Sequence, residues 1–116
     1  MLSDKAIMAV NDIITHSELA LGFVADMSLL DFMEDKKSYL AVVRCLEIIS
    51  EASRRLPDDF KNKYPEILWQ DISSAGNVYR HGYHMLDDDL VLSTVQMDLP
   101  SLLAVMLRAR RENNQD

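Results

Sequence analysis

The sequence predicts an all-α fold, an antiparallel four-helix bundle with additional short helices. Only six of the 116 residues are Gly or Pro, whereas an average chain of this length carries about 14. The good helix formers Leu, Ala and Met contribute 32 residues, and the β-branched Val, Ile and Thr contribute 17. A β-sandwich needs a turn signal about every 8–12 residues, so this composition favours helices.

Length and charge narrow the class of protein further. A chain of 116 residues allows one domain that can bury its own core without a disulfide or a metal. The net charge is −7, from 12 Lys and Arg against 19 Asp and Glu. This balance argues against a protein that coats nucleic acid or an anionic membrane with its whole surface. It remains compatible with one small basic site.

The single cysteine and the absence of long apolar runs indicate the compartment. Cys45 has no partner for an intramolecular disulfide, which favours a reducing cytosol. We find no run of about 18 apolar residues and no apolar signal segment at the N-terminus. We therefore expect a cytoplasmic protein with no membrane span.

The first third of the chain predicts one long helix and one short helix. Ser3 can cap a first helix, because apolar residues such as Ile7, Val10 and Ile14 follow at multiples of three and four positions. Ser28 to Asp31 has the pattern of a capping box, which opens a short helical turn.

The middle of the chain predicts a second long helix, from a cap at Asp35 to about Arg55. Its apolar face is formed by Tyr39, Val42, Leu46, Ile49, Ser53 and Leu56. A polar face carries Arg44, Glu47, Glu51 and Arg55, whose spacing permits ion pairs within the helix, and a solvated surface is the simplest interpretation of it. Pro57 starts a further short turn that Pro65 ends.

The last third predicts two more helices. One runs from Trp69 to about Tyr83, and Gly82 with the following aspartates marks a break. Three consecutive aspartates suit a helix N-terminus, so a new helix is expected from about Asp88, with a kink or fresh start near Pro100. We expect a single domain over residues 1–111 and a frayed tail over residues 112–116.

The segment from Gly76 to His84 carries the most chemistry. Asn77 and His81 would lie one turn apart on the same face of a helix, with Arg80 adjacent. A histidine beside an amide and an arginine can bind a phosphate and transfer a proton near neutral pH. Taken alone, the segment is more simply explained as an ordinary helix end with capping and surface roles.

Four stretches together resemble the HepT-like family of the HEPN superfamily, which are small helical ribonuclease toxins. Leu46 to Leu56 resembles the family's "LE-I-IGEA-KRL" helix, and Tyr64 to Trp69 resembles "HPEIPW". Asn77 to Tyr83 resembles "RN---HGY", and Asp98 to Leu102 resembles "NDLPxL". The resemblance covers the chain to about Arg111 and implies a HEPN-like bundle.

The resemblance also implies a function and partners. It implies a homodimer whose two protomers line a shared cleft, and metal-independent cleavage of an RNA substrate. Within the motif, His81 corresponds to the catalytic histidine and Asn77 to the motif polar residue. Tyr83 corresponds to the tyrosine that receives AMP from a minimal nucleotidyltransferase antitoxin. No cofactor is implied.

One position departs from the family pattern, Arg-x-x-x-x-His-x-Tyr, because Gly76 stands where the arginine is expected. Arg80 lies one turn further along and could supply the guanidinium instead, with Gly76 leaving room for it. The alternative is a weakened module that binds the nucleotidyltransferase or a nucleotide without cleaving RNA. By the resemblance, the helix that carries Arg44 and Glu51 borders the cleft.

Two further interpretations concern the metal-binding and sulfur-containing residues. His81, His84 and Asp88 could be taken as a metal set, but Gly82 interrupts the helix between them, so we predict no metal site. The seven methionines occur at helical spacing and are expected to fill the core.

Overall fold

The computed structural model describes residues 2–80 and 88–115, with residues 75–80 described by their backbone alone. The predicted all-α class is confirmed, and no strand occurs within these ranges. The elements in chain order are α1 (Asp4–Phe23), α2 (Leu29–Glu34), α3 (Lys36–Arg54), α4 (Asp58–Asn62), α5 (Trp69–Arg80), α6 (Asp88–Ser93), the π-helical turn η1 (Thr94–Asp98) and α7 (Leu99–Asn114).

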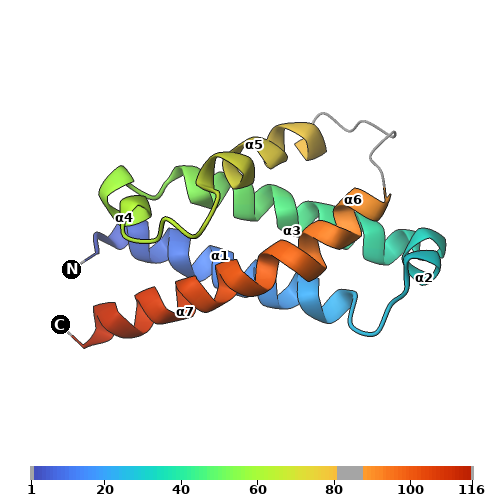
Figure 1. Cartoon of the computed structure of the whole chain (residues 1–116), viewed down its shortest axis with the longest axis horizontal. Helices are drawn as coiled ribbons and strands as arrows, with labels where there is room; N and C mark the ends of the chain where they lie inside the picture. Colours follow the sequence, from blue (N-terminus) through green and yellow to red (C-terminus); the bar gives the residue numbers. More distant parts are fainter. Residues whose placement is uncertain (1, 81–87, 116) are drawn as a thin grey trace.

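The long helices pack side by side (Figure 1). Helix α1 contacts α3 on one side and α7 on the other, and α5 packs on α3. The short helix α4 lies at the end of the molecule where both termini are found, and α2 lies at the opposite end (Figure 1). Helix α5 runs back along α3 from the α4 end, so the two are antiparallel (Figure 1).

The predicted starts of α1, α2 and α3 are confirmed, and each is stabilised by a local side-chain cap. The Ser3 hydroxyl accepts from the backbone N–H of Ala6 at the start of α1. Ser28 and Asp31 form the reciprocal capping box of α2. Asp35 accepts from the N–H of Ser38 at the start of α3, and hydrogen bonds from the Ser38 backbone and hydroxyl lower the Asp35 pKa. These caps supply acceptors for N–H groups that have no partner within the helix.

The core is formed by the apolar faces that the spacing predicts. On α3, Val42, Leu46 and Ile49 are buried, and Cys45 lies beside them with a thiol pKa raised by burial. Helix α1 contributes Val10, Ile13 and Ile14, and α7 contributes Leu99, Leu102 and Met106. The expectation that all methionines fill the core is wrong, because Met8, Met33 and Met97 are 61%, 53% and 73% exposed.

The C-terminal third forms one continuous helical rod. The π-helical turn η1 lies just before Pro100, whose ring cannot accommodate the carbonyl one turn earlier in a regular α-helix. Helix α7 continues to Asn114, through residues that we expected to form a frayed tail. The Asn113 side chain explains part of this order, since its Oδ1 accepts from the N–H of Leu2 at 2.9 Å.

This rod also bears on the expectation that the chain has no membrane span. Residues Asp88–Asn114 form a helix that is long and apolar enough, by composition alone, to cross a membrane. Of its most apolar stretch, 39% is buried inside the bundle, where α7 packs against α1. The apolar face of this rod is therefore used for the core, as in a bundle helix.

Candidate functional site

Helix α5 carries the motif segment, and its start is held by Trp69. The indole Nε1 of Trp69 donates to the carbonyls of Lys61 and Tyr64, both at 3.1 Å. The Trp69 ring packs edge-on against Phe60 at 6.3 Å between centroids. Because Lys61 and Phe60 belong to α4, this contact joins the two helices and sets where α5 begins.

A cluster of three serines joins α5 to α3 one turn further along. The Ser50 hydroxyl donates to the backbone carbonyl of Ser73 at 2.8 Å. The Ser53 hydroxyl donates to the carbonyl of Ser50 at 2.6 Å and lies 3.1 Å from the Ser73 hydroxyl. Ser50 and Ser53 are 1% and 0% exposed, so these bonds are shielded from water. The serine cluster therefore fixes the sliding position of α5 on α3.

This anchoring places the backbone of the motif residues. Gly76, Asn77 and Arg80 follow Ser73 by three, four and seven positions on α5, which is the spacing of one helix face. Ser73 is on the α3-facing side, so these positions continue that side toward the C-terminal end of α5. Asn77 and Arg80 are thus three positions apart on α5, whereas His81, the residue predicted to share a face with Asn77, lies outside the described residues.

The α3 turns that lie level with the end of α5 carry polar residues that the sequence singles out. In an antiparallel pair, the last turns of α5 run alongside the α3 turns that precede Ser50, where Arg44 and Glu47 lie. The Arg44 side chain is 70% exposed and its Nη1 lies 3.7 Å from a carboxylate oxygen of Glu47. Glu51 is exposed. Arg44 is thus a solvent-accessible cation on the helix that supports the motif.

Arg55 behaves differently from the rest of its predicted polar face. Its Nη2 donates to Asp12 Oδ2 on α1 at 2.8 Å, and its side chain is 31% exposed. His16 lies one turn further on α1 and its Nδ1 is 2.7 Å from the Asp12 carbonyl. Spacing within one helix could not reveal the Asp12–Arg55 pair, because its members are 43 residues apart.

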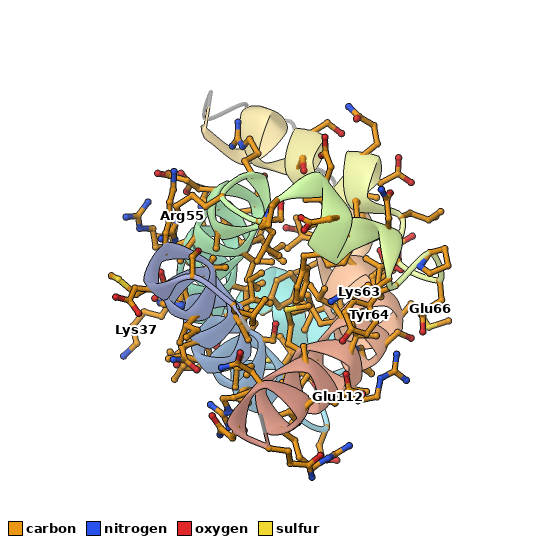
Figure 2. The ribbon with its side chains drawn as sticks, turned by 90° about the vertical axis from the view of Figure 1, so that its left-hand side faces the viewer. Lys37, Arg55, Lys63, Tyr64, Glu66 and Glu112 are labelled. Carbon is orange, nitrogen blue, oxygen red and sulfur yellow. The ribbon has the colours of Figure 1, made fainter. Side chains whose placement is uncertain are left out.

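A second polar network lies at the α4 end of the bundle. The Tyr64 hydroxyl donates to Glu112 at 3.3 Å, and the guanidinium of Arg108 lies over the Tyr64 ring at 5.1 Å. Arg108 also pairs with Glu66 at 3.3 Å. Burial and the nearby Glu112 carboxylate raise the pKa of Tyr64. Figure 2 views the molecule from this end and shows Tyr64 and Glu66 on one side of the view and Arg55 on the other.

This network borders an open cavity of about 440 Å³ that is lined by both acidic and basic side chains, among them Asp59, Lys63 and Glu112. The cavity lies at the end where α5 begins, whereas the motif occupies the end of α5 nearer α2 (Figure 1). Arg108 ties α7 to the segment between α4 and α5 through its pair with Glu66. The network thus holds the start of α5 in place.

Several predicted site residues lie outside the described residues. These are His81, Tyr83 and His84, so neither the catalytic histidine, the AMP acceptor nor the alternative metal set has a structural account. Asp88, the last member of that set, opens α6. Burial, with a smaller contribution from the Asp88 charge, raises the pKa of Tyr39, so the start of α6 lies near α3.

Comparison with known proteins identifies similar chains. A family model described as "Ribonuclease HepT-like" matches residues 13–109. A protein of Thermococcus cleftensis named "Probable ribonuclease HepT" is 37% identical over 102 residues, which cover 88% of this chain and 93% of that protein. No solved structure matches the chain.

Two further relatives carry names of the same kind. A candidate RNase of Methanocaldococcus jannaschii is 33% identical over 90 residues, which cover 78% of this chain and 74% of that protein. A candidate RNase of Caldanaerobacter subterraneus is 30% identical over 90 residues, covering 78% of this chain and 80% of that protein. The matched region of the family model includes all of α5 and the segment that follows it.

Proposed function

Since the chain belongs to the ribonuclease HepT-like family, we propose that it is a metal-independent endoribonuclease and the toxin of a toxin–antitoxin pair. The observation that carries this proposal is the family match over residues 13–109, which spans Asn77, Arg80 and His81. The helical framework supports it, because α5 is anchored at Trp69 and at the serine cluster and presents Asn77 and Arg80 beyond those anchors.

The proposed reaction needs a proton carrier and a phosphate-binding cation. His81 would accept the proton of the ribose 2′-hydroxyl or donate a proton to the leaving 5′-oxygen. The 2′-oxygen forms a bond to phosphorus as the bond from phosphorus to the 5′-oxygen breaks, leaving a cyclic phosphate and a free 5′-hydroxyl. Arg80 would steady the charge on the phosphate oxygens in place of the arginine that Gly76 replaces. Asn77 would orient the phosphate by hydrogen bonding.

The cleft would be shared between the two protomers of a homodimer. One protomer offers few cations near the motif. Arg44 lies in the α3 turns level with the last turns of α5, but on a different face of α3 from Ser50 and Ser53, which contact α5. Two copies related by a two-fold axis would double this positive charge in a single cleft. This accounts for RNA binding by a chain whose net charge is −7. Glu51 would lie at the rim of the same cleft.

Regulation would act on the same segment. A minimal nucleotidyltransferase antitoxin would transfer AMP from ATP to the Tyr83 hydroxyl, with pyrophosphate leaving. An anionic nucleotide two residues from His81 would fill the cleft and repel the phosphates of RNA. Such a toxin would act in the cytoplasm, where RNA and the partner are found.

Gly76 favours a second candidate function. Without the motif arginine, the chain would bind the nucleotidyltransferase or a nucleotide without cleaving RNA. Loss of one preorganised charge donor can lower a rate by about 10²–10³. The two candidates therefore differ in whether Arg80 compensates for Gly76.

The deciding experiment compares RNA cleavage and growth arrest for the wild type, His81→Ala, Arg80→Ala and Gly76→Arg. The proposal expects His81→Ala to abolish cleavage and Arg80→Ala to lower it by about 10²–10³. Arg111→Ala is the matched control, because Arg111 is an exposed arginine near the far end of α7 and its loss should change neither readout.

The outcomes separate the two functions. A silent wild type that gains cleavage in Gly76→Arg would establish the non-cleaving module and refute the active nuclease. Unchanged cleavage in Arg80→Ala together with its loss in His81→Ala would refute the relocated arginine alone. Co-expression with the nucleotidyltransferase should add one AMP mass to the peptide that contains Tyr83, and should leave Tyr83→Phe unmodified.

A further inference from the structure

Exposed apolar side chains are concentrated at the end of the bundle that holds α2. This part of the molecule, called the α2 end below, comprises residues 23–40 and 88–98, which include α2, the first turn of α3, α6 and η1. Helices α2 and α6 lie at this end in Figure 1, and η1 follows α6 along the rod. The α2 end contains 29 of the 116 residues. Seven of the ten exposed large apolar side chains among the described residues lie there. Chance alone would put about a quarter of them at this end, so the concentration calls for an explanation.

Helix α2 presents an apolar strip to solvent. Phe32 is 0% exposed and packs against the Tyr39 ring at 5.8 Å between centroids, so it anchors α2 to α3. Leu30 is 62% exposed and Met33 is 53% exposed. These two residues are three positions apart and therefore neighbours on the helix surface. Phe32 is the buried residue that packs α2 on α3, whereas Leu30 and Met33 keep more than half of their surface exposed to solvent.

The neighbouring rod adds apolar surface to the same end. Helix α6 packs against α2, and the Gln96 side chain donates to the Met27 carbonyl just before α2 at 3.4 Å. Met97, adjacent to Gln96, is 73% exposed, and Leu90 on α6 is 54% exposed. The exposed apolar residues thus come from two segments, far apart in sequence, that meet at this end.

The same end is strongly acidic. It holds seven Asp or Glu residues and two Lys, a net charge of −5 out of −7 for the whole chain. Asp26, Glu34 and Asp98 are among these carboxylates and all three are exposed. Most of the cations lie elsewhere, since ten of the 12 Lys and Arg fall outside the α2 end.

This charge decides which occupant fits. Nucleic acid and anionic lipid would be repelled at short range, where screening by salt is incomplete. If a second copy of this chain bound through the same surface, two surfaces that each carry a net charge of −5 would face and repel each other. A segment with apolar side chains flanked by Lys or Arg fits this surface, because its apolar side chains can pack on the apolar strip and its cations can pair with the carboxylates.

We infer that the α2 end docks a basic amphipathic segment of another protein, with Leu30, Met33 and Met97 receiving its apolar face and Asp26, Glu34 and Asp98 pairing with its cations. This mode is helix-on-surface recognition, in which a few apolar anchors supply affinity and peripheral charges supply orientation and association rate. The inference is independent of RNA cleavage, because its surface shares no residue with the motif.

The test titrates the full chain into a fluorescein-labelled peptide that repeats Leu and Lys with helical spacing, followed by fluorescence anisotropy. Leu30→Ser and Met33→Ser should each weaken binding about tenfold, as the loss of an apolar anchor does. Leu68→Ser is the matched control, because Leu68 is 69% exposed but lies outside the α2 end, and it should bind like the wild type. Added salt should weaken binding, and Asp26→Asn with Glu34→Gln should reduce that salt dependence.

Several outcomes would overturn the inference. They are no binding of the peptide, equal binding of a scrambled peptide of the same composition, or an equal loss of binding in Leu68→Ser. Sedimentation of the wild type and of Leu30→Ser tests whether a second copy of this chain binds at this surface, since a dimer that is lost in the variant would show self-association there. Flotation of the wild type and of Leu30→Ser with anionic vesicles tests for membrane binding, and binding that is lost in the variant would show that this surface binds lipid. Circular dichroism confirms that each variant is folded, which substitution at these exposed positions should allow.

Discussion

Replacing Ser53 by alanine tests whether the serine cluster holds α5 on α3. The Ser53 hydroxyl takes part in two hydrogen bonds: within α3 it donates to the Ser50 carbonyl at 2.6 Å, and across to α5 it can accept from the Ser73 hydroxyl at 3.1 Å. Ser53 is 0% exposed, so no water can take over either bond. The substitution removes one oxygen and adds no bulk, so its effect reports on the hydrogen bonds themselves.

The size of the effect follows from these contacts. Two buried hydrogen bonds contribute about 1 kcal/mol each, and alanine regains about 0.5 kcal/mol through its higher helix propensity. The free energy of unfolding should therefore fall by about 1–2 kcal/mol. In a domain of this size, that change lowers the Tm by about 4–8 °C.

Urea unfolding followed by circular dichroism measures this difference, and Ser74→Ala supplies the matched control on α5. The Ser74 hydroxyl donates to carbonyls of its own helix, Gln70 at 2.9 Å and Asp71 at 3.3 Å, and the residue is exposed. Its loss should change the free energy of unfolding by no more than about 0.5 kcal/mol. Equal unfolding midpoints for Ser53→Ala and Ser74→Ala would refute the assigned role of the cluster.

Two further predictions concern pH. Tyr64 has a raised pKa, caused by burial and then by Glu112, so its stabilising effect is complete below the ordinary tyrosine value of about 10 and is lost as the pH rises through the higher folded value. Thermal melts should show a loss of stability in this alkaline range that Tyr64→Phe reduces; an unchanged alkaline slope would contradict this assignment. Asp35 has a pKa lowered by its hydrogen bonds from Ser38, so its contribution is present above the usual value of about 4 and is lost as the pH falls through the lower folded value. Asp35→Ala should reduce that acid sensitivity and shorten α3 by its first turn, as amide hydrogen exchange at Ser38 would report; full protection in the variant would contradict the capping role.

Features that depend on neighbours within about four residues could be predicted from the sequence. The caps at Ser3, Ser28 and Asp35 are of this kind, because a side-chain oxygen and the N–H group that it accepts from are joined by a short stretch of helix. The buried face of α3 is another, because helical spacing alone places Val42, Leu46 and Ile49 on one side.

Contacts between distant segments could not be predicted in this way. Ser53 was assigned to the apolar face of its helix, but its hydrogen bond to a serine 20 residues away depends on how α5 lies along α3. The Asp12–Arg55 pair has the same origin. Helix α2 is too short for its pattern to decide which of its apolar residues turns inward, and packing against Tyr39 selects Phe32 and leaves Leu30 exposed.

The same distinction between local features and long-range contacts applies to the candidate site. Residue types and spacing were enough to select Asn77, Arg80 and His81 as candidates and to detect the family resemblance, because the side-chain types and their order are properties of the sequence. Tertiary packing alone decided that Ser50, Ser53 and Trp69 anchor the helix that carries Asn77 and Arg80, and that α2 turns an acidic, apolar surface outward. The physical reason is that helical periodicity specifies which face of a helix is apolar, whereas its sliding position and partner depend on contacts between residues that the chain brings together only on folding.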